Sequence, residues 1–127
     1  MEKTVIRTEN APAPFQGAPY NQAIRVGDLV FVAGQLGLKP GEAAVAGDVA
    51  TQTDQALRNL AAILEEAGSS LANLVKTSVF LQDLGDFAAM NEVYARHVGD
   101  RPPARSTFEV ARLPSGALVE IEAVAHL

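Results

Sequence analysis

The hydrophobic pattern of the chain predicts six β-strands, because its apolar residues alternate with polar ones or gather in short runs. The expected strands are residues 3–8, 22–26, 29–33, 75–82, 105–110 and 119–125. Gly27-Asp28 lies between the second and the third of these and is typical of a two-residue hairpin turn. The third strand is apolar on both faces, which favours a central position in a sheet that is covered on both sides.

Two further segments repeat apolar residues with helical spacing. The first covers residues 49–67, with Asp48 as a suitable N-cap and Gly68 as a suitable stop. The second begins after Asp86, which is expected to cap it, and ends before Gly99. The expected order is therefore β-β-β-α-β-α-β-β. Its strand–helix–strand units favour parallel pairing through right-handed crossovers, so we expect a mixed sheet.

Two helices cover only one face of such a sheet, yet the strands offer apolar side chains to both faces. Val30 and Phe31, for example, are neighbours on one strand and point to opposite sides. A chain of 127 residues is expected to form one domain, residues 1–127, so no second domain covers the open face. Because a large exposed apolar face is rare in a monomer, we expect another copy of the chain to cover it in an obligate homo-oligomer.

The composition argues against several classes of function. The net charge of −5 and the scattered basic residues speak against a nucleic-acid partner, since phosphate contacts need clustered Lys and Arg. The chain has no Cys, which excludes thiolate nucleophiles, and His97 and His126 are too isolated for a metal site. The N-terminus has no signal-peptide pattern, and the longest apolar run, 29–33, is too short to span a bilayer. We therefore expect a cytoplasmic protein without a membrane partner.

The last two expected strands carry the candidate chemistry. The turn-forming residues 113–116 lie between them, and the simplest topology makes the two strands antiparallel neighbours. Their polar faces then form one surface with one guanidinium and three carboxylates: Arg105, Glu109, Glu120 and Glu122. Such a surface can hold an anionic substrate and keep a base free, or it can be a solvated face with ion pairs worth about 0–1 kcal/mol each. The pattern does not distinguish which of the three Glu residues would be the base.

The same region carries motifs of a known family. Residues 103–106 (Pro-Ala-Arg-Ser), 109–114 (Glu-Val-Ala-Arg-Leu-Pro) and 120–125 (Glu-Ile-Glu-Ala-Val-Ala) closely resemble the signature of the RidA/YjgF family of reactive-intermediate deaminases. Gly34-Gln35 and residues 75–84 are similar to further parts of the family pattern. The resemblance implies an α+β fold of the chorismate-mutase-like type, with a six-stranded mixed sheet backed by two helices on one face. It also implies a homotrimer with active sites between subunits.

The resemblance also implies roles for individual residues. By position, Arg105 holds the substrate carboxylate, and a planar fork of donors suits that task. Glu120 corresponds to the residue that positions and activates the attacking water. Four further positions are implied to line the pocket or to contact the ligand through the backbone: Tyr20, Gly34, Asn91 and Thr107. Glu109 and Glu122 are left as balancing or structural charges.

Several features depart from the family pattern. Ala33 stands where the family has Ser, Gly37 replaces a Pro, and Thr107 occupies a position that is often Cys in bacterial members. The loop before Tyr20 is longer by residues 15–18. None of these changes removes Arg105 or Glu120, so they bear on the substrate range more than on the type of reaction.

The function implied by the resemblance is hydrolytic deamination of reactive 2-enamine and 2-imino acids, such as 2-aminoacrylate, to 2-keto acids and ammonia. The chemistry asks the protein to hold a carboxylate, orient one water and shuttle protons, so no cofactor or metal is expected. One alternative is a related small-molecule deaminase or a ligand-binding role in a catabolic pathway. Another is a chaperone-like activity or the ribonuclease activity attributed to the family, and the acidic balance argues against the ribonuclease.

Overall fold

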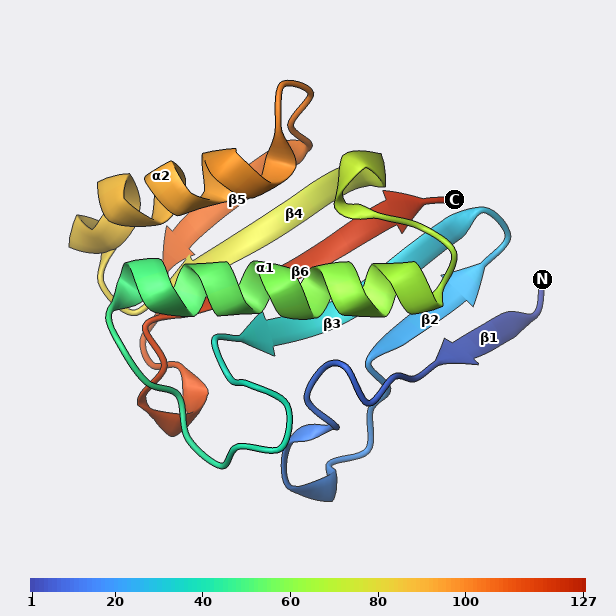
Figure 1. Cartoon of the computed structure of the whole chain (residues 1–127), viewed down its shortest axis with the longest axis horizontal. Helices are drawn as coiled ribbons and strands as arrows, with labels where there is room; N and C mark the ends of the chain where they lie inside the picture. Colours follow the sequence, from blue (N-terminus) through green and yellow to red (C-terminus); the bar gives the residue numbers. More distant parts are fainter.

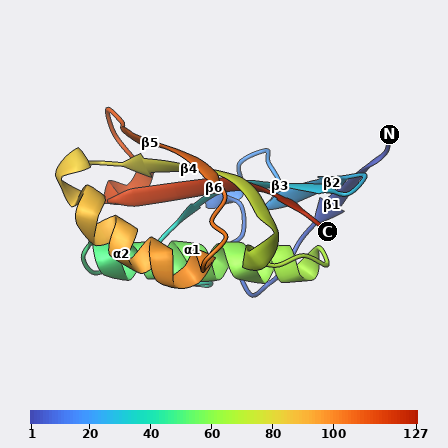
Figure 2. The same cartoon turned by 90° about the horizontal axis from the view of Figure 1, so that it is seen from above.

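The computed structural model describes residues 1–127 and forms a six-stranded mixed sheet with both α-helices on one of its faces (Figure 1). The strands are β1 (Lys3–Ile6), β2 (Ala23–Val26), β3 (Leu29–Leu36), β4 (Leu74–Leu81), β5 (Ala104–Glu109) and β6 (Val119–His126). The helices are α1 (Val49–Glu66) and α2 (Phe87–Val98). The expected α+β class, the element order and the placement of both helices on one face are confirmed (Figure 2).

The strand order in the sheet is β1-β2-β3-β6-β4-β5, with β5 at one edge. β4 and β5 run parallel and are connected through α2, whereas every other pair is antiparallel. The prediction that the last two strands are antiparallel neighbours is therefore wrong, because β4 lies between β5 and β6. The α2 crossover places β5 on the outer edge of β4, and the loop after β5 carries the chain back so that β6 enters between β3 and β4.

This order also overturns the expected common surface of one Arg and three Glu residues. Arg105 pairs with the buried Thr77 of β4, so its side chain lies on the face that the helices cover. Glu109 lies on that same face, because it is paired with the buried Leu81. Glu120 pairs with Phe80 and therefore lies on the open face, and Glu122 follows it there.

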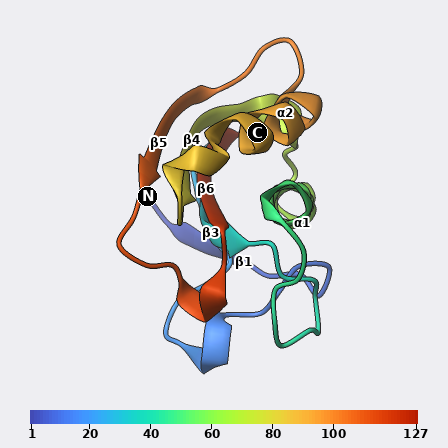
Figure 3. The same cartoon turned by 90° about the vertical axis from the view of Figure 1, so that its left-hand side faces the viewer.

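The core fills the layer between the helices and the sheet. The end-on view shows these two layers facing each other (Figure 3). α1 contributes most of its apolar stripe, including the fully buried Leu57, Leu60 and Ile63. Asp48 caps α1 as predicted, because its carboxylate accepts a hydrogen bond of 2.9 Å from the Thr51 amide. The expected cap of α2 is wrong, since Asp86 makes no capping hydrogen bond with its side chain.

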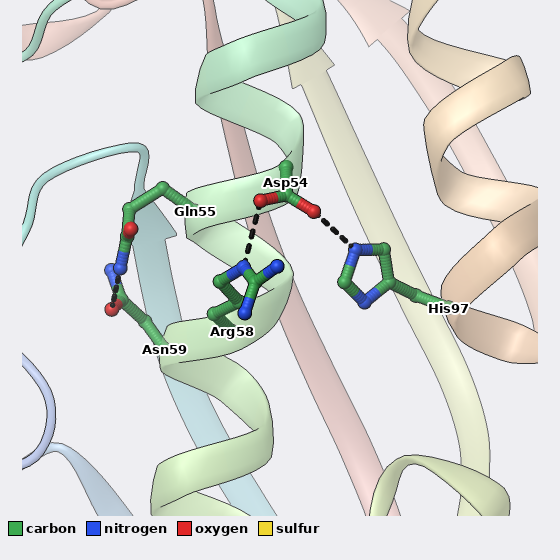
Figure 4. A network of polar contacts seen from close by, with 5 residues as sticks. All are labelled: Asp54, Gln55, Arg58, Asn59 and His97. Atoms are coloured by element: carbon green, nitrogen blue, oxygen red, sulfur yellow. Dashed lines mark hydrogen bonds and ion pairs between the residues drawn. The ribbon is translucent and has the colours of Figure 1, made fainter.

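A polar network joins the two helices on their outer side (Figure 4). One carboxylate oxygen of Asp54 lies 2.8 Å from Nε2 of His97, which stands in the last turn of α2. The other oxygen accepts a hydrogen bond of 2.7 Å from Nε of Arg58, one turn further along α1. This network holds the N-terminal part of α1 next to the C-terminal end of α2.

The face of the sheet away from the helices carries large apolar side chains that stay exposed. Leu29, Phe31 and Phe108 keep 41%, 46% and 55% of their surface accessible. Within one chain, β3 is therefore covered on one face only. That a second copy covers its other face stays a prediction. Val75 is also exposed, because the register of β4 against β6 shifts between Leu74 and Lys76. No helix in the chain combines the length and the hydropathy needed to cross a membrane.

Candidate active site

A cavity of about 660 Å³ opens beside the ends of β3 and β6. Its walls come from the loop that precedes β2, from residues 33–38 and from the turn at Pro114. Three of the predicted site residues meet here, namely Tyr20, Gly34 and Glu120, and Glu122 joins them. Arg105, Asn91 and Thr107 do not line this cavity.

Glu120 is held among apolar neighbours on the open face. Leu36 of β3 and Phe80 of β4 stand directly opposite it on the two flanking strands. The carboxylate packs against the backbone of Gly34, so closely that a Cβ atom there would lie 2.9 Å from the carboxyl carbon. Gly34 is therefore required for this close approach, since almost any other residue would displace the carboxylate.

The surroundings of Glu120 change its acidity. Burial raises the pKa of the Glu120 carboxyl above its ordinary value, and the negative charge of Glu122 adds to this increase. A raised pKa brings a carboxylate nearer to the strength of an efficient general base at neutral pH. Glu122 lies two residues further along the same face and is exposed, so its charge acts on Glu120 without sharing its burial.

The loop that walls the cavity is fixed by two side chains. The Tyr20 hydroxyl accepts a hydrogen bond of 2.6 Å from the amide of Phe15. The buried amide of Gln22 donates to the carbonyls of Thr8, Ala11 and Pro12 and accepts from the Thr8 amide. Gln22 was not among the site residues predicted from the sequence. The signal that could have indicated it is a long polar side chain beside the start of an apolar strand.

Arg105 belongs to a second cluster, between α2 and β5. Its guanidinium carbon lies 4.8 Å from the centroid of the Tyr94 ring and 5.5 Å from that of Phe87. The Tyr94 hydroxyl is 2.6 Å from that of Thr77, which holds the ring in place. Arg105 forms no ion pair within the chain, whose ion pairs involve other residues. Its charge is therefore oriented by aromatic faces and left available for an anion.

Two buried polar atoms accompany this arginine. Oδ1 of Asn91 and Oγ1 of Thr107 are shielded from solvent and have no hydrogen-bond partner. Thr107 follows Arg105 on the same face of β5, and Asn91 lies one turn before Tyr94 on α2. Unpaired buried polar atoms cost stability, so this part of the chain is less favourable than an apolar core would be.

The predicted site residues thus form two groups on opposite faces of one sheet. Arg105, with Asn91 and Thr107, lies under α2 at the β5 edge, whereas Glu120 lies on the open face of β6, two strands away. A small carboxylate held by Arg105 therefore does not reach Glu120 within one copy of the chain. The chain also contains no group of three or more His, Cys, Asp or Glu side chains placed to hold a metal ion.

Comparison with known proteins decides the family. The model of the family described as endoribonuclease L-PSP matches residues 8–127. A RutC family protein of Pyrococcus abyssi is 52% identical over 128 residues, covering 99% of this chain and 98% of the relative. The chain belongs to the L-PSP/RidA family. The resemblance noted in the sequence motifs is thereby confirmed.

Other members of the L-PSP/RidA family carry names that refer to function. The chloroplastic Reactive Intermediate Deaminase A of Arabidopsis thaliana is 44% identical and is covered over 67% of its length, while all of this chain is aligned. The solved structure of Escherichia coli TdcF with bound serine superposes with a TM-score of 0.90 at 38% identity. That similarity covers 98% of each chain.

Proposed function

We propose that this L-PSP/RidA protein hydrolyses 2-imino acids, and the enamines that tautomerise to them, to 2-keto acids and ammonia. The observation that carries the proposal is an arginine without an ionic partner, Arg105, in a chain that also holds a desolvated glutamate, Glu120. The name of the Arabidopsis relative, a reactive-intermediate deaminase, supports the same class of reaction. The serine bound to TdcF supports a small amino-acid-like ligand.

In the proposed reaction, Arg105 binds the substrate carboxylate through parallel hydrogen bonds. Water adds to the C=N carbon, forming a C–O bond while the π electrons move to nitrogen. Glu120 accepts a proton from this water and returns it to the nitrogen. The hydroxyl proton of the resulting carbinolamine then passes to the nitrogen through Glu120. The C–N bond breaks, ammonia leaves, and the C–O bond becomes the carbonyl of the 2-keto acid.

The site is proposed to lie between copies in a homotrimer, with the arginine cluster of one copy facing the Glu120 cavity of its neighbour. Two observations support this arrangement. The two groups occupy opposite faces of the sheet, and the open face carries exposed apolar residues such as Phe31 and Phe108. Another copy that covers this face would both bury the apolar surface and bring the two groups together.

The ribonuclease activity in the family description is not proposed for this chain. Phosphate recognition needs clustered positive charge. The cavity instead presents the carboxylates of Glu120 and Glu122, and the net charge of the chain is −5. These charges repel a phosphodiester backbone.

Complementation between two inactive variants tests both the chemistry and its location. Arg105→Ala and Glu120→Gln are each expected to lower kcat/KM for imine hydrolysis strongly. Losing one partner of a buried charge contact costs about 2–5 kcal/mol, which corresponds to a roughly 30- to 4,000-fold lower kcat/KM. The variants are then mixed in equal amounts, unfolded and refolded together. Random assembly into trimers leaves about one site in four with both native residues.

Recovery of about a quarter of the parental activity is the expected result of mixing. Each variant refolded by itself serves as the control and should stay inactive. If the two residues acted within one copy, mixing would restore nothing. If neither substitution lowered the rate, Arg105 and Glu120 would be structural charges and the proposed function would be wrong.

A further inference from the structure

The cavity beside Glu120 is larger than the smallest substrates of the proposed reaction require. Its volume is about 660 Å³. An imine with a methyl side chain has about six non-hydrogen atoms, each comparable to a water molecule, whose share of liquid volume is about 30 Å³. Cavities of several hundred cubic ångströms commonly hold larger ligands. In the proposed homotrimer a neighbouring copy would take up part of this space. The side chains that line the rest of the cavity then determine which substrates fit.

Much of the cavity lining is apolar and comes from this chain. We call it the apolar wall, and its members are Pro12, Phe15, Ala18, Leu36 and Leu38. Leu36 is the direct cross-strand partner of Glu120, so the wall begins beside the carboxylate. When the C=N carbon of a substrate lies at Glu120, the side chain of that substrate therefore contacts the apolar wall.

The loop part of the wall is preformed. The Tyr20 hydroxyl binds the Phe15 amide, and the Gln22 side chain donates a hydrogen bond of 2.9 Å to the Pro12 carbonyl. Gln16, beside Phe15, has a φ of 53°, in the left-handed region that residues other than glycine seldom adopt. Such a conformation persists where the surrounding contacts determine it. A preformed wall binds an apolar group without the entropic cost of ordering a loop.

We propose that the apolar wall is the side-chain pocket of the site, and that the protein prefers 2-imino acids with large apolar side chains over those with a methyl group. This inference rests on the proposed imine hydrolysis and adds the substrate class. Each additional buried CH2 group contributes about 0.8 kcal/mol, which corresponds to about a fourfold increase in kcat/KM. The imine of leucine, with three more carbons than that of alanine, is therefore expected to be favoured by about tenfold or more.

The experiment compares two imines in the same assay. L-alanine and L-leucine are oxidised to their imines by an amino-acid oxidase, and the loss of imine is measured with and without the protein. The quantity of interest is the ratio of kcat/KM for the leucine-derived imine to that for the alanine-derived imine. Because both values come from one preparation, a fraction of unfolded protein cancels in the ratio.

Substitutions at Phe15 test whether the wall causes the preference. Phe15→Ser removes the largest apolar side chain of the wall and should lower the ratio about three- to tenfold. Phe15→Leu keeps an apolar side chain there and should change the ratio less than about twofold. Leu84→Ser, which alters an exposed apolar residue outside the cavity, is the matched control and should leave the ratio unchanged.

The outcomes separate this inference from the proposed function. A parental ratio near one, with the alanine-derived imine clearly hydrolysed, would overturn the preference and leave the imine hydrolysis standing. A high parental ratio that Phe15→Ser does not lower would assign the preference to another part of the molecule and overturn the role of the wall. Failure to accelerate either imine would contradict the proposed function itself.

Discussion

The guanidinium group of Arg105 lies over the ring of Tyr94, with its central carbon 4.8 Å from the ring centroid. Phe87 supplies a second ring at 5.5 Å. Aromatic faces attract a cation without neutralising it, whereas a carboxylate partner would compete with the ligand. The two rings therefore orient the arginine and leave its hydrogen-bond donors free.

Removing the more exposed of these rings should weaken substrate binding more than turnover. Phe87→Leu takes away one cation–π contact, worth about 0.5–1 kcal/mol at an exposed site, so KM should rise about two- to fivefold. The carboxylate is held equally in the substrate complex and in the transition state, so kcat should stay within about twofold. Steady-state kinetics measure both parameters. A fall in kcat at unchanged KM would show that Phe87 acts on the chemical step instead.

The pH dependence of hydrolysis should respond to Glu122. The proposed base is ionised Glu120, so kcat/KM falls as the pH drops through its pKa, which burial and Glu122 both raise. Glu122→Gln removes only the second cause. The acidic limb of the pH profile should therefore move to lower pH and still lie above the range of an ordinary Glu. Glu109→Gln, a change on the opposite face of the sheet, is the control, and an equal shift in that variant would refute a local effect.

Glu120 is expected to cost stability at neutral pH. Because its pKa is raised in the folded protein, the folded state binds more protons than the unfolded state, and stability falls as the pH rises through that interval. Glu120→Gln removes this charge, so the variant should unfold at higher denaturant concentration than the parent at pH 7 and lose that advantage near pH 4. Chemical unfolding monitored by circular dichroism measures the difference. A Glu120→Gln protein that is less stable at neutral pH would indicate a structural role for the carboxylate.

The network around Asp54 should show the opposite pH dependence. Hydrogen bonding from Arg58, the largest cause, and from His97 holds the pKa of the Asp54 carboxyl below its ordinary value, so its contribution to stability is present above that value and is lost as the pH falls. The group is partly exposed, so we expect Asp54→Asn to cost less than about 1 kcal/mol at pH 7. Glu92→Gln breaks the exposed ion pair with Arg96 and provides the control. A cost for Asp54→Asn that persists at about pH 2 would point to packing rather than charge.

Much of the fold could be predicted from local patterns, because alternation and helical spacing are properties of neighbouring residues. The six strands, the two helices and the Asp48 cap follow from them, and the strand ends moved by only a few residues, as where β3 extends to Leu36. The open apolar face also followed from counting helices against strands. The Asp86 cap was wrong because the side chain of Asp83 caps the preceding turn instead, accepting from the Gly85 amide.

The arrangement of the candidate site could not be predicted from patterns, because it depends on which strands become neighbours. The insertion of β6 between β3 and β4 is a non-local event, and it places Arg105 and Glu120 on opposite faces. The family motifs singled out these residues as one set and did not separate them into two groups. Gln22 escaped notice for a similar reason, since its partners lie 10 to 14 residues away in the chain.

The separation of Arg105 from Glu120 links ligand binding to assembly. A ligand that touches both groups binds the proposed oligomer and not the separated chain, so its binding energy also stabilises the oligomer. By thermodynamic reciprocity, assembly raises the affinity for the ligand by the same factor by which the ligand raises the affinity between the copies. Dilution of the protein would then lower the apparent affinity for small 2-keto acids, and a saturating ligand would hold the copies together at concentrations at which they otherwise separate.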